Sequence, residues 1–268
     1  MGCTSPTSAA TIENNTTENK KGDNENNNKE VKKEVNKDND KPKYFHDMSK
    51  EDKEKIKKEI EEQDKNIEEK PKDPPTPYEN FDWNDLRKKL PVAITKEERE
   101  ERLKIWKQLN EYGKGYISFK RLYVKLTNYL GLPGILRKKD PIRLAFDAAI
   151  DKYVRYGVRK EDNLLEWMEF RIFLKYLRQY FEYWEMFQKN DSSGEHKITL
   201  AEFKNTIPKM KEWGVEIKGN QAEKEFNNIK GDDGNTISFE EFCDFAIQKS
   251  LDFDEDDDFD DEELKNLK

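Results

Sequence analysis

Side chains that carry oxygen recur at regular intervals in the segment DSSGEHKITLAE, residues 191–202. A calcium ion takes roughly six to eight oxygen ligands, which a loop of this length supplies from positions 1, 3, 5, 7, 9 and 12. Counted from residue 191, these positions hold carboxylates or hydroxyls, except position 7, where a lysine offers its backbone carbonyl. The predicted calcium ligands are Asp191, Ser193, Glu195, Lys197, Thr199 and Glu202. The alternative is a solvated polar turn that binds no metal.

The frame around this loop occurs four times in the chain. Each copy has an apolar residue, three further residues, a loop of the same length with an aliphatic residue at position 8, and another apolar residue. The loops span residues 110–121, 158–169, 191–202 and 230–241. This is the EF-hand frame, in which a helix, an oxygen-rich loop and a second helix follow one another. Because position 8 pairs with a partner hand through a short strand, four hands predict two paired lobes.

The fourth loop keeps only part of the ligand set. Asp232, Ser238 and Glu241 occupy positions 3, 9 and 12, but position 1 holds the cation Lys230 and position 5 is Gly234. We therefore predict weak or absent calcium binding in this loop. The alternative is a purely structural hand that pairs with the third and holds Lys230 near the vacant site.

Position 6 of a calcium loop is normally glycine, because the loop turns sharply there. The third loop has His196 and the fourth has Asn235 at this position. Both residue types adopt a positive φ more readily than most others, so we expect the turn in both loops.

The first two loops lack essential ligands. Arg121 stands at position 12 of the first loop, where a bidentate carboxylate is needed. Val158 and Lys160 stand at positions 1 and 3 of the second loop. Both loops are predicted to be metal-free and to be kept for packing.

Helix signals flank these loops. Thr95 followed by Glu98 forms a capping box, and Asp140 with Pro141 begins another helix. Residues 164–187 are rich in aromatic side chains and contain no Gly or Pro, which predicts one or two continuous helices. Signals for β-hairpins are absent, so the predicted class is all-α.

The predicted organisation has four parts. Residues 1–80 form a disordered, charged arm that holds an isolated, exposed helix over 49–69 and a proline-rich linker over 70–78. The remaining parts are the first EF-hand pair over 81–188, the second pair over 189–250 and an acidic tail over 251–268.

Composition supports this division. Only 33% of the 268 residues are hydrophobic and 40% are charged, against roughly 45–50% and 25% in a typical globular domain. The net charge of −8 arises in residues 251–268, which hold ten of the 58 acidic residues and two of the 50 basic ones. A solvated end is the default interpretation of this tail, and a calcium-attracting or partner-binding tail is the alternative.

Several classes of protein are not expected. The chain has no apolar run long enough to span a membrane, and two cysteines provide no disulfide framework. Its two histidines are His46 and His196, and it has no nucleophile motif or glycine-rich phosphate loop, so an enzyme is not expected. Since no basic face stands out, nucleic acid is not an expected partner either.

Three short motifs carry a family resemblance. Residues 83–91 read WNDLRKKLP, residues 169–171 read EFR, and residues 202–215 read EFKNTIPKMKEWGV. In these motifs the chain resembles the flagellar calcium-binding proteins, or calflagins, of flagellated protozoa. The resemblance implies two inactive N-terminal hands followed by calcium-binding C-terminal hands. Lys230 departs from this pattern, because the family has an acidic residue there.

The resemblance also implies a lipid anchor, myristate on Gly2 and palmitate on Cys3. One myristoyl chain gives only marginal membrane binding, whereas a second acyl chain makes it stable. Pro6 stands where the myristoylation pattern prefers Ser or Thr. The alternative for Gly2 is an ordinary small residue.

The sequence therefore predicts a membrane-anchored EF-hand calcium sensor at the cytoplasmic face of the flagellar, ciliary or plasma membrane. Its expected partners are membrane lipid, through the acyl chains, and an unidentified protein target. The alternative is a calcium-independent, lipid-anchored adaptor with degenerate EF-hands.

Overall fold

The computed structural model describes the parts of the chain that hold most of the predicted loops. The described residues are 45, 48–67, 83–111, 113–132, 140–155, 163–231 and 234–251. Gly2, Cys3, Asp232, the linker over 70–78 and all but the first residue of the acidic tail lie outside them. So does the start of the second loop, residues 158–162.

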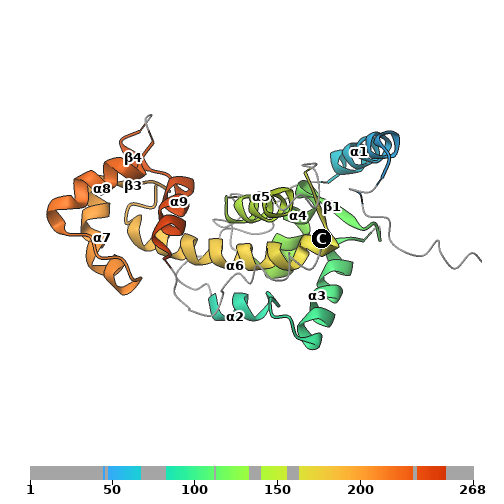
Figure 1. Ribbon diagram of the computed structural model, residues 1–268, viewed down its shortest axis with the longest axis horizontal. Coiled ribbons are helices and arrows are strands. Elements are labelled where there is room, and N and C mark those ends of the chain that lie inside the picture. Colours follow the sequence, from blue (N-terminus) through green and yellow to red (C-terminus); the bar gives the residue numbers. More distant parts are fainter. Residues whose placement is uncertain are drawn as a thin grey trace, which may run out of the picture. The chain divides into compact units, whose positions relative to one another are not determined.

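The described chain is mostly helical (Figure 1). Its first elements are α1 (Lys50–Lys65), α2 (Trp83–Lys88), α3 (Lys96–Leu109), β1 (Tyr116–Ser118), α4 (Phe119–Leu130) and α5 (Asp140–Arg155). The next are β2 (Leu164–Glu166), α6 (Trp167–Asn190), β3 (Ile198–Thr199) and α7 (Leu200–Glu212). The last are the 3-10 helix η4 (Gly219–Gln221), α8 (Ala222–Ile229), β4 (Thr236–Ile237) and α9 (Phe239–Lys249). No described helix is both long enough and apolar enough to cross a membrane.

The short strands join the loops in pairs. Strands β1 and β2 are antiparallel with Ile117 opposite Leu165, and β3 and β4 are antiparallel with Ile198 opposite Ile237. These four residues stand at position 8 of the predicted loops, so the strand pairing predicted there is confirmed. All four side chains are at most 2% exposed. Each two-stranded ribbon, β1–β2 (the first ribbon) or β3–β4 (the second ribbon), is therefore stabilised by apolar contact as well as by backbone hydrogen bonds.

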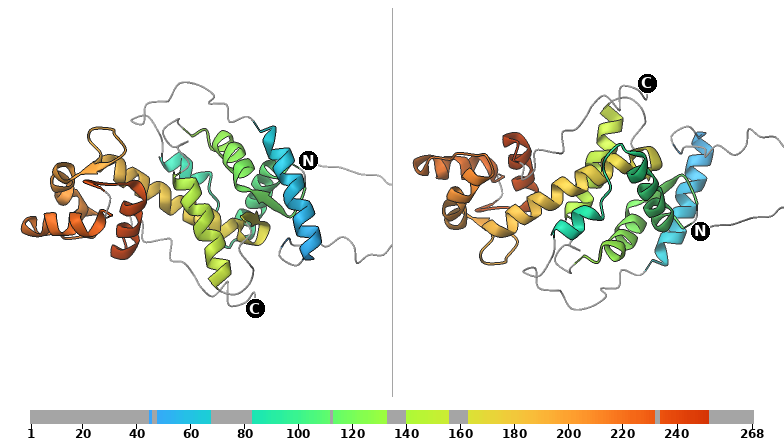
Figure 2. Two further views of the ribbon diagram at one scale, coloured as in Figure 1. Left: turned by 90° about the horizontal axis from the view of Figure 1, so that it is seen from above. Right: turned by 90° about the horizontal axis from the view of Figure 1, so that it is seen from below.

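The aromatic stretch forms one continuous helix, α6, with α5 alongside it (Figure 2). Near its start, Phe170 lies 5.1 Å from Trp106 of α3, between ring centroids. Near its end, Trp184 lies 4.8 Å from Phe239 of α9. Helix α6 therefore contributes to the packing around both ribbons, and most of its aromatic side chains fill the core.

Predicted helix starts agree with the structure. Helix α3 begins after Thr95, whose hydroxyl accepts the Glu98 N–H at 3.3 Å, and α5 begins at Asp140 as the Asp-Pro signal predicts. Helix α1 begins after Ser49, whose hydroxyl accepts the Asp52 N–H at 3.1 Å. Local signals in the sequence thus predict where these three helices begin, although the Thr95 box is only half formed, since Glu98 Oε2 accepts the Ala93 N–H at 2.5 Å.

Helix α1 is not isolated, which corrects the prediction from sequence. Phe45 is fully buried and forms an apolar cluster with Tyr116 of β1 and Leu164 of β2, against which Ile56 and Ile60 of α1 pack. The helix therefore belongs with the first ribbon. Its apolar stripe is too thin to predict a packing partner, and the residues that cover it are far away in sequence.

Candidate metal centre

The third loop is organised around the carboxylate of Asp191, which follows the end of α6. Its Oδ1 accepts the N–H groups of Gly194 at 2.8 Å and Glu195 at 3.2 Å, and the Ser193 hydroxyl at 3.1 Å. Its Oδ2 accepts the His196 N–H at 2.7 Å. The buried carboxylate at position 1 therefore accepts the backbone N–H groups of positions 4, 5 and 6.

The carboxylate of Glu202 closes the same loop from the first turn of α7. Its Oε1 accepts the Ser193 N–H at 2.9 Å and the Ser192 hydroxyl at 3.0 Å. Its Oε2 accepts the Thr199 N–H at 2.9 Å and the Thr199 hydroxyl at 2.8 Å. The carboxylate at position 12 is therefore hydrogen-bonded to positions 3 and 9. Ser193 connects it to position 1, because the Ser193 N–H donates to Glu202 and the Ser193 hydroxyl donates to Asp191.

These hydrogen bonds decide the charge of Glu202, whose side chain is 8% exposed. Burial by itself raises the pKa of this carboxyl group, but the N–H and hydroxyl donors of Thr199, Ser193 and Ser192 outweigh burial. The net result is a pKa lowered to about 2. The loop therefore holds Glu202 as a carboxylate with four donors directed at it.

Position 6 turns as predicted in the third loop, because His196 has φ of 59°. Its ring stacks on Trp184 of α6 with centroids 6.0 Å apart and planes inclined by 21°. This ring contact holds a residue other than glycine in the left-handed region. The residue type of Asn235 tolerates the same conformation in the fourth loop, but Asn235 is not among the described residues with positive φ.

The third loop assembles part of the predicted ligand set. Asp191, Ser193, Thr199 and Glu202 are joined by hydrogen bonds, whereas the side chain of Glu195 is exposed. The predicted ligand of Lys197 is its backbone carbonyl, which the exposure of its side chain does not affect. In the described part of the chain, no group of three or more acidic, His or Cys side chains stands ready to hold a metal. The donors that do converge are all oxygens, which fits calcium or another hard cation. Glu195 would complete the set only by turning inward.

The lysine at position 1 of the fourth loop is hydrogen-bonded within that loop. The Lys230 ammonium donates to the backbone oxygen of Gly234 at 2.9 Å and thus joins positions 1 and 5. Glu241 Oε2 accepts the Ser238 N–H at 2.7 Å and its hydroxyl at 2.8 Å, and Oε1 accepts the Gly231 N–H. A Cβ on Gly231 would lie 2.7 Å from that Oε1, so glycine permits this approach.

The charge of Lys230 also acts on Glu241. Burial raises the pKa of this carboxyl group, but the donors of Ser238 and Gly231, together with the Lys230 charge, lower it below its ordinary value. The fourth loop is thus closed by groups of the chain itself.

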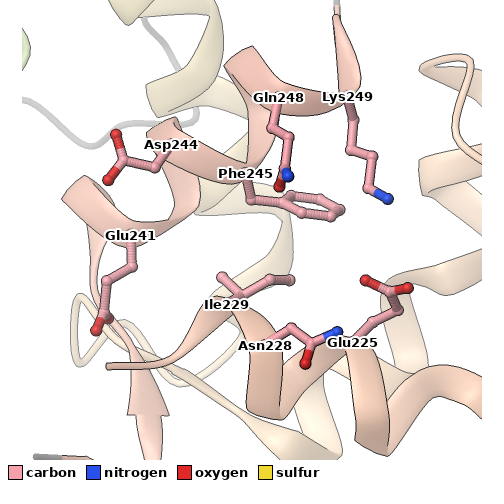
Figure 3. Close-up of a pocket in the computed structure, with 8 residues that line it drawn as sticks. All are labelled: Glu225, Asn228, Ile229, Glu241, Asp244, Phe245, Gln248 and Lys249. Atoms are coloured by element: carbon pink, nitrogen blue, oxygen red, sulfur yellow. The ribbon is translucent and has the colours of Figure 1, made fainter. Parts of the chain in front are cut away.

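Behind the fourth loop, a pocket opens between α8 and α9 (Figure 3). Its lining residues are Glu225, Asn228, Ile229, Glu241, Asp244, Phe245, Gln248 and Lys249. In Figure 3, Ile229 and Phe245 lie in the middle, and the carboxylate of Glu241 points away from them. Since Glu241 is engaged by Ser238 and Gly231, the pocket does not extend the loop's ligand set.

Comparison with known proteins identifies the family of the chain. The family model described as FCaBP EF-hand domain matches residues 86–177. The flagellar calcium-binding protein TB-24 of Trypanosoma brucei brucei is 32% identical over 170 residues, which cover 63% of this chain and 77% of TB-24. The chain belongs to the flagellar calcium-binding protein family.

Other members of the family align over the same part of the chain. TB-17 of Trypanosoma brucei brucei is 32% identical over 170 residues, covering 63% of this chain and 72% of TB-17. The flagellar calcium-binding protein of Trypanosoma cruzi is 26% identical over 177 residues, covering 66% of this chain and 83% of that protein.

In this member of the flagellar calcium-binding protein family, position 12 of each N-terminal loop has a structural role. Arg121 of the first loop pairs with Asp64 of α1, with Nη2 and Oδ1 3.3 Å apart. Glu169 of the second loop is fully buried and accepts the Glu166 N–H at 2.8 Å, within the capping box that begins α6.

Sequence reasoning missed two residues that matter here. Ser192 stands at position 2, which supplies no ligand in the EF-hand pattern, yet its hydroxyl holds Glu202. Asp64 lies 57 residues before Arg121, so no local pattern links them. A signal was present, because an acidic residue in the last turn of a helix is unfavourable unless a cation compensates it.

Proposed function

We propose that this chain is an EF-hand calcium-binding protein of the flagellum, with four hands in two pairs, and that calcium binds mainly in the third loop. One observation carries the proposal. Asp191 and Glu202, at positions 1 and 12, converge through Ser193 while His196 makes the required turn. The names of the relatives add support, since they describe flagellar calcium-binding proteins.

A sensor role follows from where the ligands stand. Calcium supplies positive charge that offsets the repulsion between the loop's carboxylates. Glu202 is the third residue of α7, so a change in the position of its carboxylate is passed directly to that helix. Helix α7 packs through Phe203 and Met210, both fully buried, and moving it would expose apolar surface to a protein target.

The fourth loop, in this proposal, binds no calcium. The Lys230 ammonium bridges to Gly234, and Glu241 is satisfied by Ser238 and Gly231. A divalent cation would have to displace a like charge from the loop, which is unfavourable at short range. The expected stoichiometry is therefore one calcium per chain.

Membrane attachment is the second part of the proposal. Acylation of Gly2 and Cys3 would hold the chain on the cytoplasmic face of the flagellar, ciliary or plasma membrane. A single acyl chain would bind reversibly, whereas two would anchor the protein stably.

A calcium-independent, lipid-anchored adaptor is the competing function. The observation that favours it is that a cation of the chain is bound by a protein oxygen in two of the four loops, through Arg121–Asp64 and Lys230–Gly234. A fold held in this way needs no ion for its integrity. Partner binding that is identical with and without calcium would favour this function.

Calorimetric titration of the full chain with calcium tests the sensor proposal. We expect one binding event in the wild type, its loss in Glu202→Gln, and its retention in Glu241→Gln, the matched change at position 12 of the paired loop. Unaltered binding in Glu202→Gln, or no binding up to the millimolar range of weak EF-hand sites, would exclude the third loop as a calcium site.

A further inference from the structure

The acidic end of helix α1 lies against the first loop at positions that supply ligands in a calcium-binding hand. Position 5, Lys114, places its ammonium 3.1 Å from Glu59 Oε2. Position 9, Ser118, donates its hydroxyl to Asp64 Oδ2 at 2.6 Å. Position 12, Arg121, pairs with Asp64 Oδ1 at 3.3 Å. Three ligand positions of this loop thus contact carboxylates of one helix.

The contact with Asp64 is shielded from water. The side chains of Arg121 and Asp64 are only 10% and 13% exposed, against 29% and 44% for Lys114 and Glu59. Exposed ion pairs contribute little because water and salt screen them, while shielded pairs are screened less. Both oxygens of Asp64 are occupied by donors of the loop, so this pair is the centre of the contact.

The backbone at the end of α1 is engaged by the same loop. The ammonium of Lys120 donates to the Asp64 backbone oxygen at 2.7 Å. Helix ends leave carbonyl groups without partners inside the helix, and the partial negative charge there disfavours an anion such as Asp64. Lys120 and Arg121 supply the cations that this end needs. An acidic residue at a helix C-terminus is unfavourable by itself, and the contacts of Asp64 with Lys120 and Arg121 compensate for it.

An apolar contact fixes the position of the segment. Phe45 meets Tyr116, at position 7 of the loop, edge to face with centroids 5.3 Å apart. Ile56 and Ile60 of α1 pack on the cluster that these rings form with Leu164. The loop and its ribbon therefore present a surface that fits an amphipathic helix with an acidic end.

We propose that the first EF-hand loop is a carboxylate-binding site whose ligand is the acidic end of helix α1. Arg121 at position 12 gives the loop a positive charge where a calcium-binding loop carries a negative one. The loop therefore binds the Asp64 carboxylate in place of a metal ion. The contact acts as a latch between the N-terminal segment and the EF-hand body. Helix α1 has 16 residues, none of them buried, and such a helix is marginal alone. The inference does not rest on calcium binding in the third loop.

Hydrogen exchange of the full chain, followed by mass spectrometry, tests this proposal. Asp64→Asn should accelerate exchange across α1 by about tenfold or more, because hydrogen bonds to a charged group are lost. The matched control is Glu62→Gln, which removes the same charge from an exposed position of the same helix and should leave exchange unchanged. Peptides from α6 report whether the body of each variant remains folded.

A second variant and salt complete the test. Arg121→Gln should release α1 as Asp64→Asn does, and the double variant should add little, because both remove one interaction. Raising salt from about 0.05 to about 0.5 M should screen the exposed Lys114–Glu59 pair more than the shielded Arg121–Asp64 pair, and should therefore accelerate α1 exchange in the wild type less than Asp64→Asn does. Unchanged α1 exchange in both single variants with α6 still protected, or an equal effect of Glu62→Gln, would overturn the proposal.

Discussion

At the scale of residues, the charge at positions 1 and 12 distinguishes the first, third and fourth loops. The third has acids at both positions, the fourth has Lys230 at position 1, and the first has Arg121 at position 12. In each exception the cation is engaged by an oxygen of the protein, from Gly234 or from Asp64. In the fourth loop, which keeps Asp232, Ser238 and Glu241, Lys230 is the side chain whose replacement tests whether the loop can surround an ion.

Replacing that side chain should restore the lost site. We expect Lys230→Asp to add a second calcium-binding event in calorimetry, because positions 1, 3 and 12 of the fourth loop would then be acidic. Lys224→Asp, the same charge change at an exposed position of α8, is the control and should leave one event. A single event in Lys230→Asp would show that another feature disables the loop.

Glu202 should make stability depend on pH. Its pKa is lowered from 4.5 to about 2, so the folded state binds this proton less readily than the unfolded state. The resulting stabilisation, on the order of 3 kcal/mol, is complete above about pH 5 and is lost as the pH falls toward 2. Urea unfolding of the calcium-free chain at several pH values measures it.

The control for the pH experiment is in the same loop. Glu195→Gln changes an exposed side chain and should keep the acid dependence, whereas Glu202→Gln should lose the part that Glu202 contributes. Equal slopes of stability against pH in the wild type and Glu202→Gln would contradict the assignment.

At the scale of elements, each ribbon joins two loops through a pair of buried aliphatic residues. Ile198 and Ile237 are both fully buried, and each stands in a strand just before the helix that carries position 12. The geometry of the third loop therefore depends on the fourth even if the fourth binds no ion. This gives a physical reason for a loop without metal to remain in the chain.

Shortening Ile237 in the fourth loop should affect the third loop, because Ile237 pairs with Ile198. Ile237→Ala should destabilise the chain by about 2–4 kcal/mol through the cavity it leaves and should weaken calcium binding in the third loop. Ile247→Ala, at a side chain that is 48% exposed, should do neither. Thermal unfolding and calorimetry measure the two effects, and undiminished calcium affinity in Ile237→Ala would argue against coupling through the ribbon.

At the scale of the whole molecule, the proposed anchor and the calcium loop lie far apart in the sequence, at residues 2–3 and 191–202. Helix α1 lies between them in the sequence and packs on the first ribbon. The proposed calcium binding and the proposed membrane attachment involve different residues, so single substitutions can test them one at a time.

Membrane attachment should depend on the first three residues. Gly2→Ala should shift the protein from the membrane fraction to the soluble fraction of cells that acylate it, because no myristate can be added. Cys3→Ser should leave weak, reversible attachment through one chain. Fractionation followed by immunoblotting measures both, with Ser5→Ala as control. Equal membrane fractions in all variants would exclude this anchor.

The sequence by itself determined the spacing of the loops, the pairing at position 8, the helix starts and the aromatic helix. These features follow from short-range rules, because ligand spacing, caps and side-chain periodicity involve residues that are close along the chain. Only the tertiary structure decided that α1 docks on the first loop, that Lys230 bridges to Gly234, and that Asn235 does not take the positive φ expected of position 6. Such contacts depend on which charged and apolar groups meet after folding. Arg121 shows the difference: its type excluded a calcium ligand, but its partner Asp64, 57 residues away, became evident only in three dimensions.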